Sequence, residues 1–313
     1  EVARRFQGHR NVVRPQLGPE AETAVTLAEK LGYMPILGGN SVTLIADTNE
    51  MIDRLVKDID AAENHVHLLF YIYVADPTGH RVADALRRAV DRGVACRLMV
   101  DGVGSRRMLK TLAPELAEYG VEVYAALPVG LFRRRMARID LRNHRKIAVI
   151  DGRVGYAGSQ NIVSANYGHK DLAWSDLMVR LTGPAVLELQ AVFVGDWYSE
   201  SGVLLDNEDI FPVPVLEGEV PVQAVPSGPN FPTENFQHMV VAALYTARRQ
   251  VTITTPYFVP DKPLMQALEV AVLRGVQVEL IVPRRSDQRI VTAASRAYYD
   301  DLLDAGVRLY LYD

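Results

Sequence analysis

The sequence contains a single cysteine, Cys96, among its 313 residues. One cysteine excludes an intramolecular disulfide and a zinc site built from cysteines, so the fold does not depend on an oxidising compartment. Cys96 lies in the apolar run 94–100, which predicts a buried strand. Long apolar runs are also lacking, because none approaches the roughly 18 residues of a membrane span. The chain opens on Glu1 with a polar, basic segment, and we expect it to be a piece of a longer protein.

A large excess of charge of one sign is absent too. The 34 Lys and Arg against 38 Asp and Glu leave a net charge of -4, with an isoelectric point near 6.0. A generally basic nucleic-acid binder is therefore not indicated, and we expect no nucleic-acid partner. The composition, 49% apolar and 23% charged, is typical of globular proteins. The length fits two domains or one large domain.

The sequence contains an internal repeat. Residues 62–102 and 247–283 each predict a strand, a loop, an amphipathic helix, an Arg-Gly-Val turn and a second strand. Residues 117–127 and 303–313 continue the likeness. Alternating strands and helices predict an α/β fold, a repeat of two βαβ-rich halves with sheets flanked by helices. Only seven residues follow Gly306, so we expect the second half to be incomplete.

Proline usage indicates where the halves join, since six of the 17 prolines fall between residues 203 and 236. The predicted organisation has four parts. They are an N-terminal segment (1–40), a first domain (41–205), a Pro-rich connection (206–235) and an incomplete second domain (236–313).

The chemistry is concentrated in residues 141–168. We expect a strand over 144–150, which places His144 and Lys146 on one face, where both can converge on a phosphate. Lys supplies a positive charge to phosphate oxygens, and His supplies an attacking nitrogen or a proton. Asp151 then begins a turn. Ser159 and Asn161 follow in a small loop suited to capping a helix or holding an oxyanion.

The full string, His-x-Lys-x4-Asp-x6-Gly-Ser-x-Asn, resembles the signature of the phospholipase D superfamily. The segments LRNHRKIAVIDG, PSGP (226–229), TPYFVPD (255–261) and residues 294–312 look like bacterial cardiolipin synthases. The resemblance runs from about residue 35 to residue 313, nearly the whole chain.

This resemblance implies a mechanism. Each of two similar halves contributes one motif; one His attacks phosphorus to form a phospho-histidine, and the other protonates the leaving alcohol. It further implies no metal and no cofactor, phosphatidylglycerol as donor and acceptor, and release of glycerol. His144 is then the nucleophile. The implied location is the cell membrane, peripheral or through an anchor outside this sequence, with the catalytic part on the cytoplasmic side.

A nucleophilic His needs a partner that fixes its tautomer. Asp151 and Asp176 are both candidates. We favour Asp176, because it begins the apolar strand 177–181 and an equivalent acid in the resembled family supports the His. Asp151 then shapes the turn.

Three further features carry weaker signals. Arg142 and Arg145 belong to a basic stretch, residues 131–146, which we interpret as a surface that binds lipid phosphate or docks on anionic membrane; the alternative is a solvated loop. Tyr257, with the tyrosines of residues 71 and 73, ends a first strand of the repeat and either lines the lipid pocket or packs in the core. His65 and His67 lack a third ligand at metal spacing, which favours a structural role.

Two alternatives stay open. The same motif serves a phospholipase D-type hydrolase or nuclease, because transfer and hydrolysis differ only in the acceptor. The non-enzymatic hypothesis is that the chain is a catalytically inert fragment that binds lipid headgroups. The sequence leaves the oligomeric state open.

Overall fold

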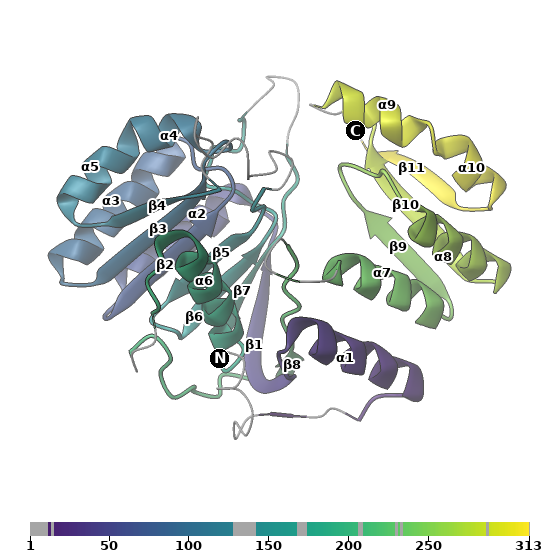
Figure 1. The fold of residues 1–313 in the computed structure, drawn as a ribbon, viewed down its shortest axis with the longest axis horizontal. Coiled ribbons are helices and arrows are strands. Elements are labelled where there is room, and N and C mark those ends of the chain that lie inside the picture. The colour runs from purple at the N-terminus through teal and green to yellow at the C-terminus, as the bar shows by residue number, and fades with distance from the viewer. Residues whose placement is uncertain are drawn as a thin grey trace. The chain divides into compact units, whose positions relative to one another are not determined.

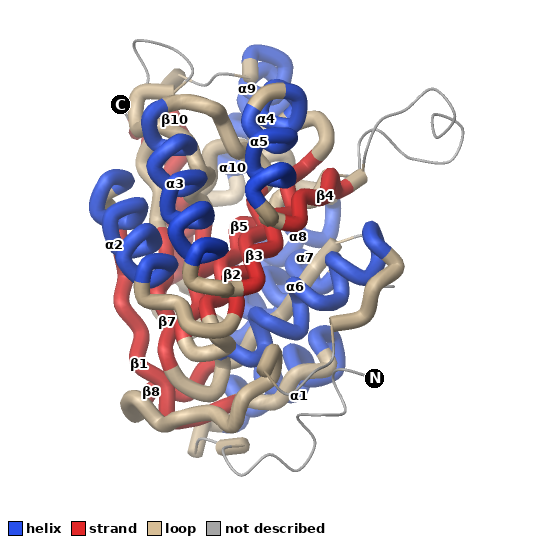
Figure 2. The backbone as a smooth tube through the Cα atoms, turned by 90° about the vertical axis from the view of Figure 1, so that its left-hand side faces the viewer, coloured by secondary structure: helices blue, strands red, loops and turns tan. Residues whose placement is uncertain are grey.

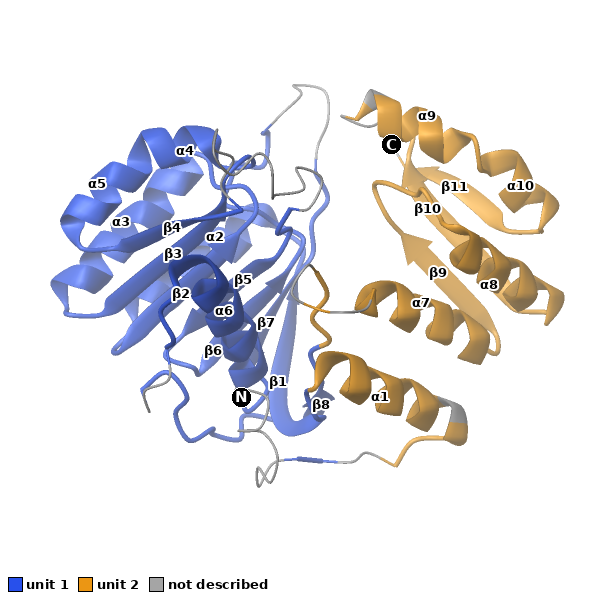
Figure 3. Ribbon diagram, viewed as in Figure 1, with its two compact units in different colours: residues 1–15, 34–167, 173–224 blue, residues 16–33, 168–172, 225–313 orange. Residues whose placement is uncertain are grey.

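The computed structural model describes residues 12–13, 16–127, 142–167, 174–205, 209–228, 231, 234–285 and 288–312. The chain divides into two compact units (Figure 3). The first comprises residues 1–15, 34–167 and 173–224, and the second comprises residues 16–33, 168–172 and 225–313.

An eight-stranded sheet forms the centre of the first unit, in the order β4-β3-β2-β5-β6-β7-β1-β8 (Figure 1). β2, β3 and β4 run parallel, whereas β5 pairs antiparallel with both β2 and β6. β5 is therefore an interior strand with a hydrogen-bonded neighbour on each side. The strands are β1 (Leu37–Ile45), β2 (His65–Phe70), β3 (Ala95–Asp101), β4 (Glu122–Ala126), β5 (Lys146–Ile150), β6 (Val154–Gly158), β7 (Met178–Thr182) and β8 (Val220–Val222).

Helices cover both faces of this sheet, because alternate residues of its central strands point to opposite sides. In β2, Val66 and Leu68 belong to the apolar cluster that also contains the buried residues of α2, α3 and α5. Leu69 points the other way, into the cluster of α6. Figure 2 shows α2 and α3 on one side of the strands and α6 on the other. The helices are α2 (Thr48–Asp60), α3 (Pro77–Asp91), α4 (Arg106–Lys110), α5 (Leu112–Tyr119) and α6 (Val186–Ser201).

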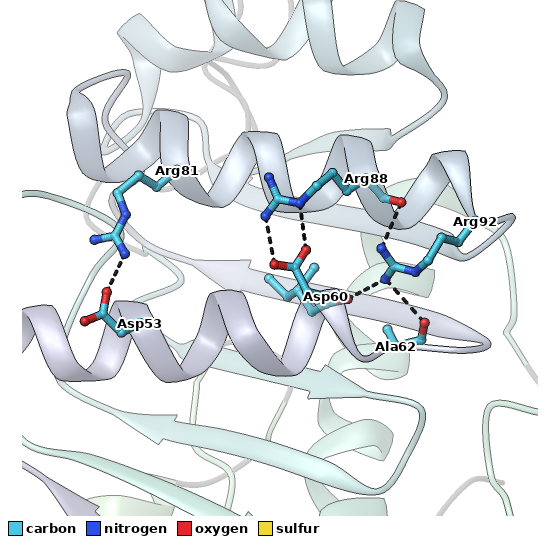
Figure 4. Close-up of polar contacts among 7 residues, drawn as sticks. Asp53, Asp60, Ala62, Arg81, Arg88 and Arg92 are labelled. Carbon is cyan, nitrogen blue, oxygen red and sulfur yellow. Dashed lines mark hydrogen bonds and ion pairs between the residues drawn. The ribbon is translucent and has the colours of Figure 1, made fainter.

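Ion pairs join α2 to α3 along their exposed side (Figure 4). Arg81 pairs with Asp53, and both nitrogens of the Arg88 guanidinium fork contact Asp60 at 2.9 Å. Arg92 donates to two backbone carbonyls at the end of α2. Exposed pairs of this kind contribute only about 0–1 kcal/mol each, so the buried apolar cluster stabilises the layer more than they do.

The second unit contains a three-stranded parallel sheet in the order β11-β10-β9. Helix α1 belongs to this unit although it lies far from it in sequence, since Asn235 of α7 donates to the carbonyl of Leu31 at 2.9 Å. The elements are α1 (Pro19–Gly32), α7 (Asn235–Thr246), β9 (Gln250–Thr254), α8 (Lys262–Leu273), β10 (Gln277–Pro283), α9 (Arg289–Arg296), α10 (Tyr299–Asp304) and β11 (Arg308–Tyr312).

The predicted α/β class is confirmed, and the repeat corresponds to the same local structure in both units. The helix after the first strand begins in both cases with an Asp cap and has a proline in its first two positions: Asp76 accepts from an N–H of α3, and Asp261 accepts from one of α8. Both helices are followed by a glycine with φ near +84°, Gly93 (+85°) and Gly275 (+83°). A left-handed conformation favours glycine at the end of a helix, so the Arg-Gly-Val turn has one physical explanation in both copies.

The strands extend beyond the expected domain limits. β1 begins at Leu37, inside the predicted N-terminal segment, because it pairs with β7 and β8. β8 falls inside the predicted Pro-rich connection, yet it joins the sheet of the first unit. Within the described ranges, no helix is both long enough and apolar enough to cross a membrane.

Candidate active site at the start of β5

His144 and Lys146 lie at the point where the chain enters β5. The strand begins at Lys146, two residues later than expected, and His144 precedes it. Lys146 is paired in register with Phe70, the last residue of β2. The residues just before β5 therefore lie beside the chain that leaves β2, where Tyr71 follows directly.

Tyr71 contacts both motif residues. Its ring stacks on the imidazole of His144, with 3.8 Å between ring centroids and 18° between planes. The Nζ atom of Lys146 lies 5.2 Å from the centroid of the same ring, within the range of a cation–π contact. Lys146 Nζ also donates to the backbone carbonyl of His144 at 2.6 Å. The lysine and histidine are thus brought together.

The electrostatics favour a neutral imidazole beside a charged amine. Desolvation is the main cause that lowers the pKa of His144, followed by the positive charges of Lys146 and Arg142, while Asp101 opposes them. Burial lowers the pKa of the half-buried Lys146 to about 8, and the charge of Asp176 counteracts part of that effect. At neutral pH most of the imidazole is therefore unprotonated, whereas most of the amine carries its charge.

Asp176 and Ser159 form a hydrogen-bonded pair. Ser159 Oγ donates to a carboxylate oxygen of Asp176 at 2.6 Å, and the Leu177 N–H donates to Ser159 Oγ at 3.0 Å. In the part of the chain that the structure describes, no hydrogen bond joins Asp176 to His144. Its influence on the site runs instead through its charge, which acts on Lys146.

Asn161 ties two loops together. Its side-chain oxygen accepts from the N–H of Ile72 at 2.9 Å, and the N–H of Ile162 donates to the carbonyl of Ile72 at 3.1 Å. The loop after β6 is thereby fixed to the loop after β2. The side-chain oxygen is engaged by backbone rather than directed to a ligand.

Asp151 lies at the opposite end of β5 from His144. They are seven positions apart, roughly 23 Å of extended chain, so the structure does not group Asp151 with the other motif residues. Its two carboxylate oxygens accept from three consecutive backbone N–H groups, those of Glu63, Asn64 and His65, at 2.8–2.9 Å. The carboxylate anchors the start of β2 and fixes the turn between β5 and β6.

The arginines expected to bind substrate point into the protein instead. The Arg142 side chain is 8% exposed; it donates to the Leu127 carbonyl at 3.0 Å and lies 3.6 Å from the buried carboxylate of Asp101. Arg145 contacts the buried Asp196 of α6 at 2.5 Å. Both arginines hold the segment that leads into β5. Apart from residues 142–146, the basic stretch lies outside the described residues.

Tyr257 lies in the second unit, and its place in the repeat differs from the expected one. In the first sheet His65 is paired with Ala95, and in the second sheet Gln250 is paired with Gln277. Ala95 and Gln277 each lie two residues after the glycine that ends the preceding helix, Gly93 and Gly275. Counting along these registers, Tyr257 corresponds to Ile72, and Tyr71 corresponds to Pro256. The side chain of Tyr257 is exposed.

Sequence reasoning left Tyr71 open between the lipid pocket and the core, and it did not assign Asp101 to the site. Each follows or ends a buried strand, and the carboxyl ends of parallel strands β2 and β3 meet at one edge of the sheet. Asp101 is 1% exposed, and one of its oxygens accepts from the N–H groups of Val103 and Gly104. Asp101 could have been identified in the sequence as an acidic residue at the end of an apolar strand.

The paired histidines lie in the core, away from this site. His65 and His67 stack on each other with 4.4 Å between centroids, and both contact the amide of Gln190. Burial is the main cause that lowers the pKa of each. Over the described ranges, no group of three His, Cys, Asp or Glu side chains has the arrangement of a metal site.

The chain is similar to known proteins over most of its length. A family model described as "Cardiolipin synthase, PLD-like domain" matches residues 55–197 and 240–313. Cardiolipin synthase A of Serratia proteamaculans is 39% identical over 282 residues, covering 88% of this chain and 58% of that protein. Cardiolipin synthase A of Proteus mirabilis is 37% identical over 301 residues, covering 94% and 62%. The chain thus spans about three fifths of the length of these curated relatives.

A solved structure shares the fold. The phosphatidylserine synthase of Haemophilus influenzae superposes with a TM-score of 0.61 at 13% sequence identity, covering 92% of this chain and 79% of that one.

Proposed function

The chain belongs to the cardiolipin synthase family of phospholipase D-like proteins, and on that premise we propose that the whole protein is a phosphatidyltransferase. It joins two phosphatidylglycerol molecules into cardiolipin and releases glycerol. The similarity to curated cardiolipin synthases over 88% and 94% of this chain supports this assignment.

The reaction proceeds in two displacements. A ring nitrogen of His144 attacks the phosphorus of the first phosphatidylglycerol and the bond from phosphorus to the headgroup oxygen breaks. That oxygen takes a proton from the histidine of the second motif of the whole protein, and glycerol leaves as a neutral alcohol. A headgroup hydroxyl of the second phosphatidylglycerol then gives its proton to that same second histidine and attacks the phospho-histidine, and the bond from nitrogen to phosphorus breaks, which restores both histidines. The scheme calls for no cofactor and no metal, since both displacements use the histidine as the group carrier.

The observation that carries the proposal is the contact between His144 and Lys146. The pKa of His144 is lowered chiefly by desolvation, so a nucleophilic nitrogen is present at neutral pH. Lys146 keeps most of its charge below its pKa of about 8 and is placed to stabilise the negative oxygens of the phosphate as charge develops.

The other motif residues support this pair. Asp176 keeps Lys146 charged, and Ser159 fixes Asp176 through its hydroxyl. Asn161 and Asp151 hold the loops that surround β5. We also propose that the repeat forms two phospholipase D-like halves, with this motif in the first.

The substrates are membrane lipids, so the protein acts at a membrane surface, on its cytoplasmic side. Anionic phosphatidylglycerol is both its substrate and the lipid that a basic segment attracts. Arg142 and Arg145 serve this process indirectly, by fixing the entry to β5 through Asp101 and Asp196.

The test uses the whole protein with phosphatidylglycerol labelled in its phosphate and presented in mixed micelles. We expect labelled cardiolipin and an equal amount of free glycerol. His144→Ala is expected to abolish both, because no other group replaces the nucleophile. The matched control is His80→Ala, which removes an exposed histidine of α3 and is expected to leave turnover unchanged.

Two results would overturn the assignment. Labelled phosphatidic acid without cardiolipin would show a phospholipase D-type hydrolase, with water as the acceptor. Lipid binding that survives His144→Ala, without any turnover by the wild-type protein, would show a headgroup-binding protein.

A further inference from the structure

One aromatic ring contacts both residues of the pair at the start of β5. The Tyr71 ring lies against the face of the His144 imidazole, 3.8 Å between centroids, and 5.2 Å from Lys146 Nζ. The stack covers one face of the imidazole. The lone pair of an imidazole nitrogen lies in the ring plane, so a contact with the face fixes that plane and leaves the reactive edge free.

We propose that Tyr71 is a positioning residue for the phosphodiester chemistry of His144 and Lys146, an inference that rests on the proposed function. Its ring sets the plane of the imidazole and holds the lysine ammonium beside it. Catalysis by a bound nucleophile depends on such alignment, because a displacement of about 1 Å costs a rate factor of up to about 10².

The usual orienting contact is missing from the described residues, which gives the stack its importance. A nucleophilic histidine is commonly oriented by a carboxylate bonded to its second ring nitrogen. In the described ranges, neither Asp176 nor Asp101 forms a hydrogen bond with His144. The stack on Tyr71 is the ring contact that constrains His144 there.

The backbone around Tyr71 is itself held in place. Ser105 Oγ donates to the Tyr71 carbonyl at 3.0 Å and accepts from the Tyr73 N–H at 2.9 Å. Gly104 packs so closely that a Cβ there would lie 2.5 Å from the Tyr71 carbonyl oxygen. A ring attached to this clamped segment is a fixed surface.

The second copy of the repeat has a similar serine contact but lacks the aromatic ring. There the Phe258 N–H donates to Ser295 Oγ at 3.2 Å, as Tyr73 does to Ser105 in the first copy. The position equivalent to Tyr71 is occupied by Pro256. The bond from the backbone N–H to the serine hydroxyl therefore belongs to the repeated fold, whereas the aromatic ring is present only in the copy that contains His144.

The hydroxyl and the ring of Tyr71 can be tested separately. Among the described residues, the hydroxyl has no hydrogen-bond partner, so Tyr71→Phe keeps the stack and is expected to retain a kcat within about twofold of wild type. Tyr71→Leu keeps an apolar side chain but removes the ring. We expect it to lower kcat by about 10², with KM for phosphatidylglycerol almost unchanged, since the ring orients the nucleophile rather than the lipid.

The stack itself is measured by NMR of the whole protein in micelles, without turnover. The ring of Tyr71 shifts the carbon-bound imidazole proton signals of His144 upfield through its ring current. This shift is expected to persist in Tyr71→Phe and to disappear in Tyr71→Leu. Tyr198→Leu, at an exposed position of α6, is the matched control and is expected to change neither readout.

The outcomes separate this inference from the proposed function. A folded Tyr71→Leu protein with wild-type kcat would overturn the inference and leave the phosphatidyltransferase assignment intact. Equal losses in Tyr71→Phe and Tyr71→Leu would also overturn it, because the hydroxyl would then be the important group. Absence of His144-dependent products in the wild type would overturn the assignment, while an absent ring-current shift would overturn the stack. If Tyr71→Leu does not fold, Tyr71→Met gives the same comparison.

Discussion

Replacement of Asp151 is expected to affect stability rather than chemistry, although this residue belongs to the motif. Its carboxylate accepts three backbone N–H bonds from residues 63–65. Bonds to a charged acceptor contribute about 1.5–3 kcal/mol each, but they share one acceptor group and do not add fully. Asp151 also has φ of +52°, a conformation that costs alanine about 1–2 kcal/mol. Asp151→Ala should therefore lower the free energy of unfolding by about 4 kcal/mol.

The substitution Asp151→Asn distinguishes the hydrogen bonds that the two carboxylate oxygens accept. Two of the three N–H groups, those of Asn64 and His65, donate to one carboxylate oxygen, and Glu63 donates to the other. Asp151→Asn keeps an oxygen for the first two and tolerates positive φ, so a loss of about 1.5 kcal/mol is expected, one charge-assisted bond.

Urea denaturation followed by circular dichroism measures these losses, and kcat is measured on the folded fraction. The control is Asp84→Ala, an exposed acid of α3 paired with Arg87, which is expected to cost less than about 1 kcal/mol. An Asp151→Ala protein with an unchanged free energy of unfolding but a greatly lowered kcat would refute the reasoning. Asp151 would then be a catalytic residue.

Three other predictions concern protonation. The pH dependence of kcat/KM is expected to be bell-shaped, rising as His144 loses its proton below pH 6.5 and falling as Lys146 loses its proton near pH 8; a flat profile over this range would contradict the assignment of both groups. Asp176→Ala removes a charge that raises the pKa of Lys146, so the alkaline limb is expected to move to lower pH, and an unmoved limb would remove Asp176 from the site. Burial raises the pKa of Glu188 from 4.5 to about 8. Between these two pH values the folded state holds a proton that the unfolded state has released. The stability that Glu188 contributes below pH 4.5 is therefore lost as pH rises to 8. Glu188→Gln is expected to lack this loss, so urea denaturation should find its free energy of unfolding raised, relative to wild type, more at pH 8 than at pH 5; equal differences at both pH values would contradict the argument.

The fold was largely predictable from the sequence because its signals are local. The glycines after α3 and α8, and the Asp cap with a proline in the first two positions of both helices, determine backbone conformations by themselves. The two copies could therefore be aligned before any contact was known. The membership of β1 and β8 in the first sheet was not predictable in this way. β1 pairs with β7, about 140 residues away, and β8 pairs with β1, about 180 residues away.

The site was only partly predictable, for a related reason. Spacing along a strand placed His144 and Lys146 together, but it gives no information about the partners of a side chain. Arg142 and Arg145 look alike in sequence, as basic residues before a motif. Their directions are determined by Asp101 and Asp196, which lie 41 and 51 residues away.

The interior position of β5 has a consequence for exchange of backbone amide hydrogens. Residues Ile147–Ile150 are buried and hydrogen-bonded to β2 on one side and β6 on the other. Their amides become accessible to solvent only when the sheet opens, so they should be among the slowest to exchange deuterium in the first unit. His144, the proposed nucleophile, thus lies two residues before a very persistent part of the chain. If the proposed function is right, we expect β5 to stay closed while lipid enters and leaves the site next to it.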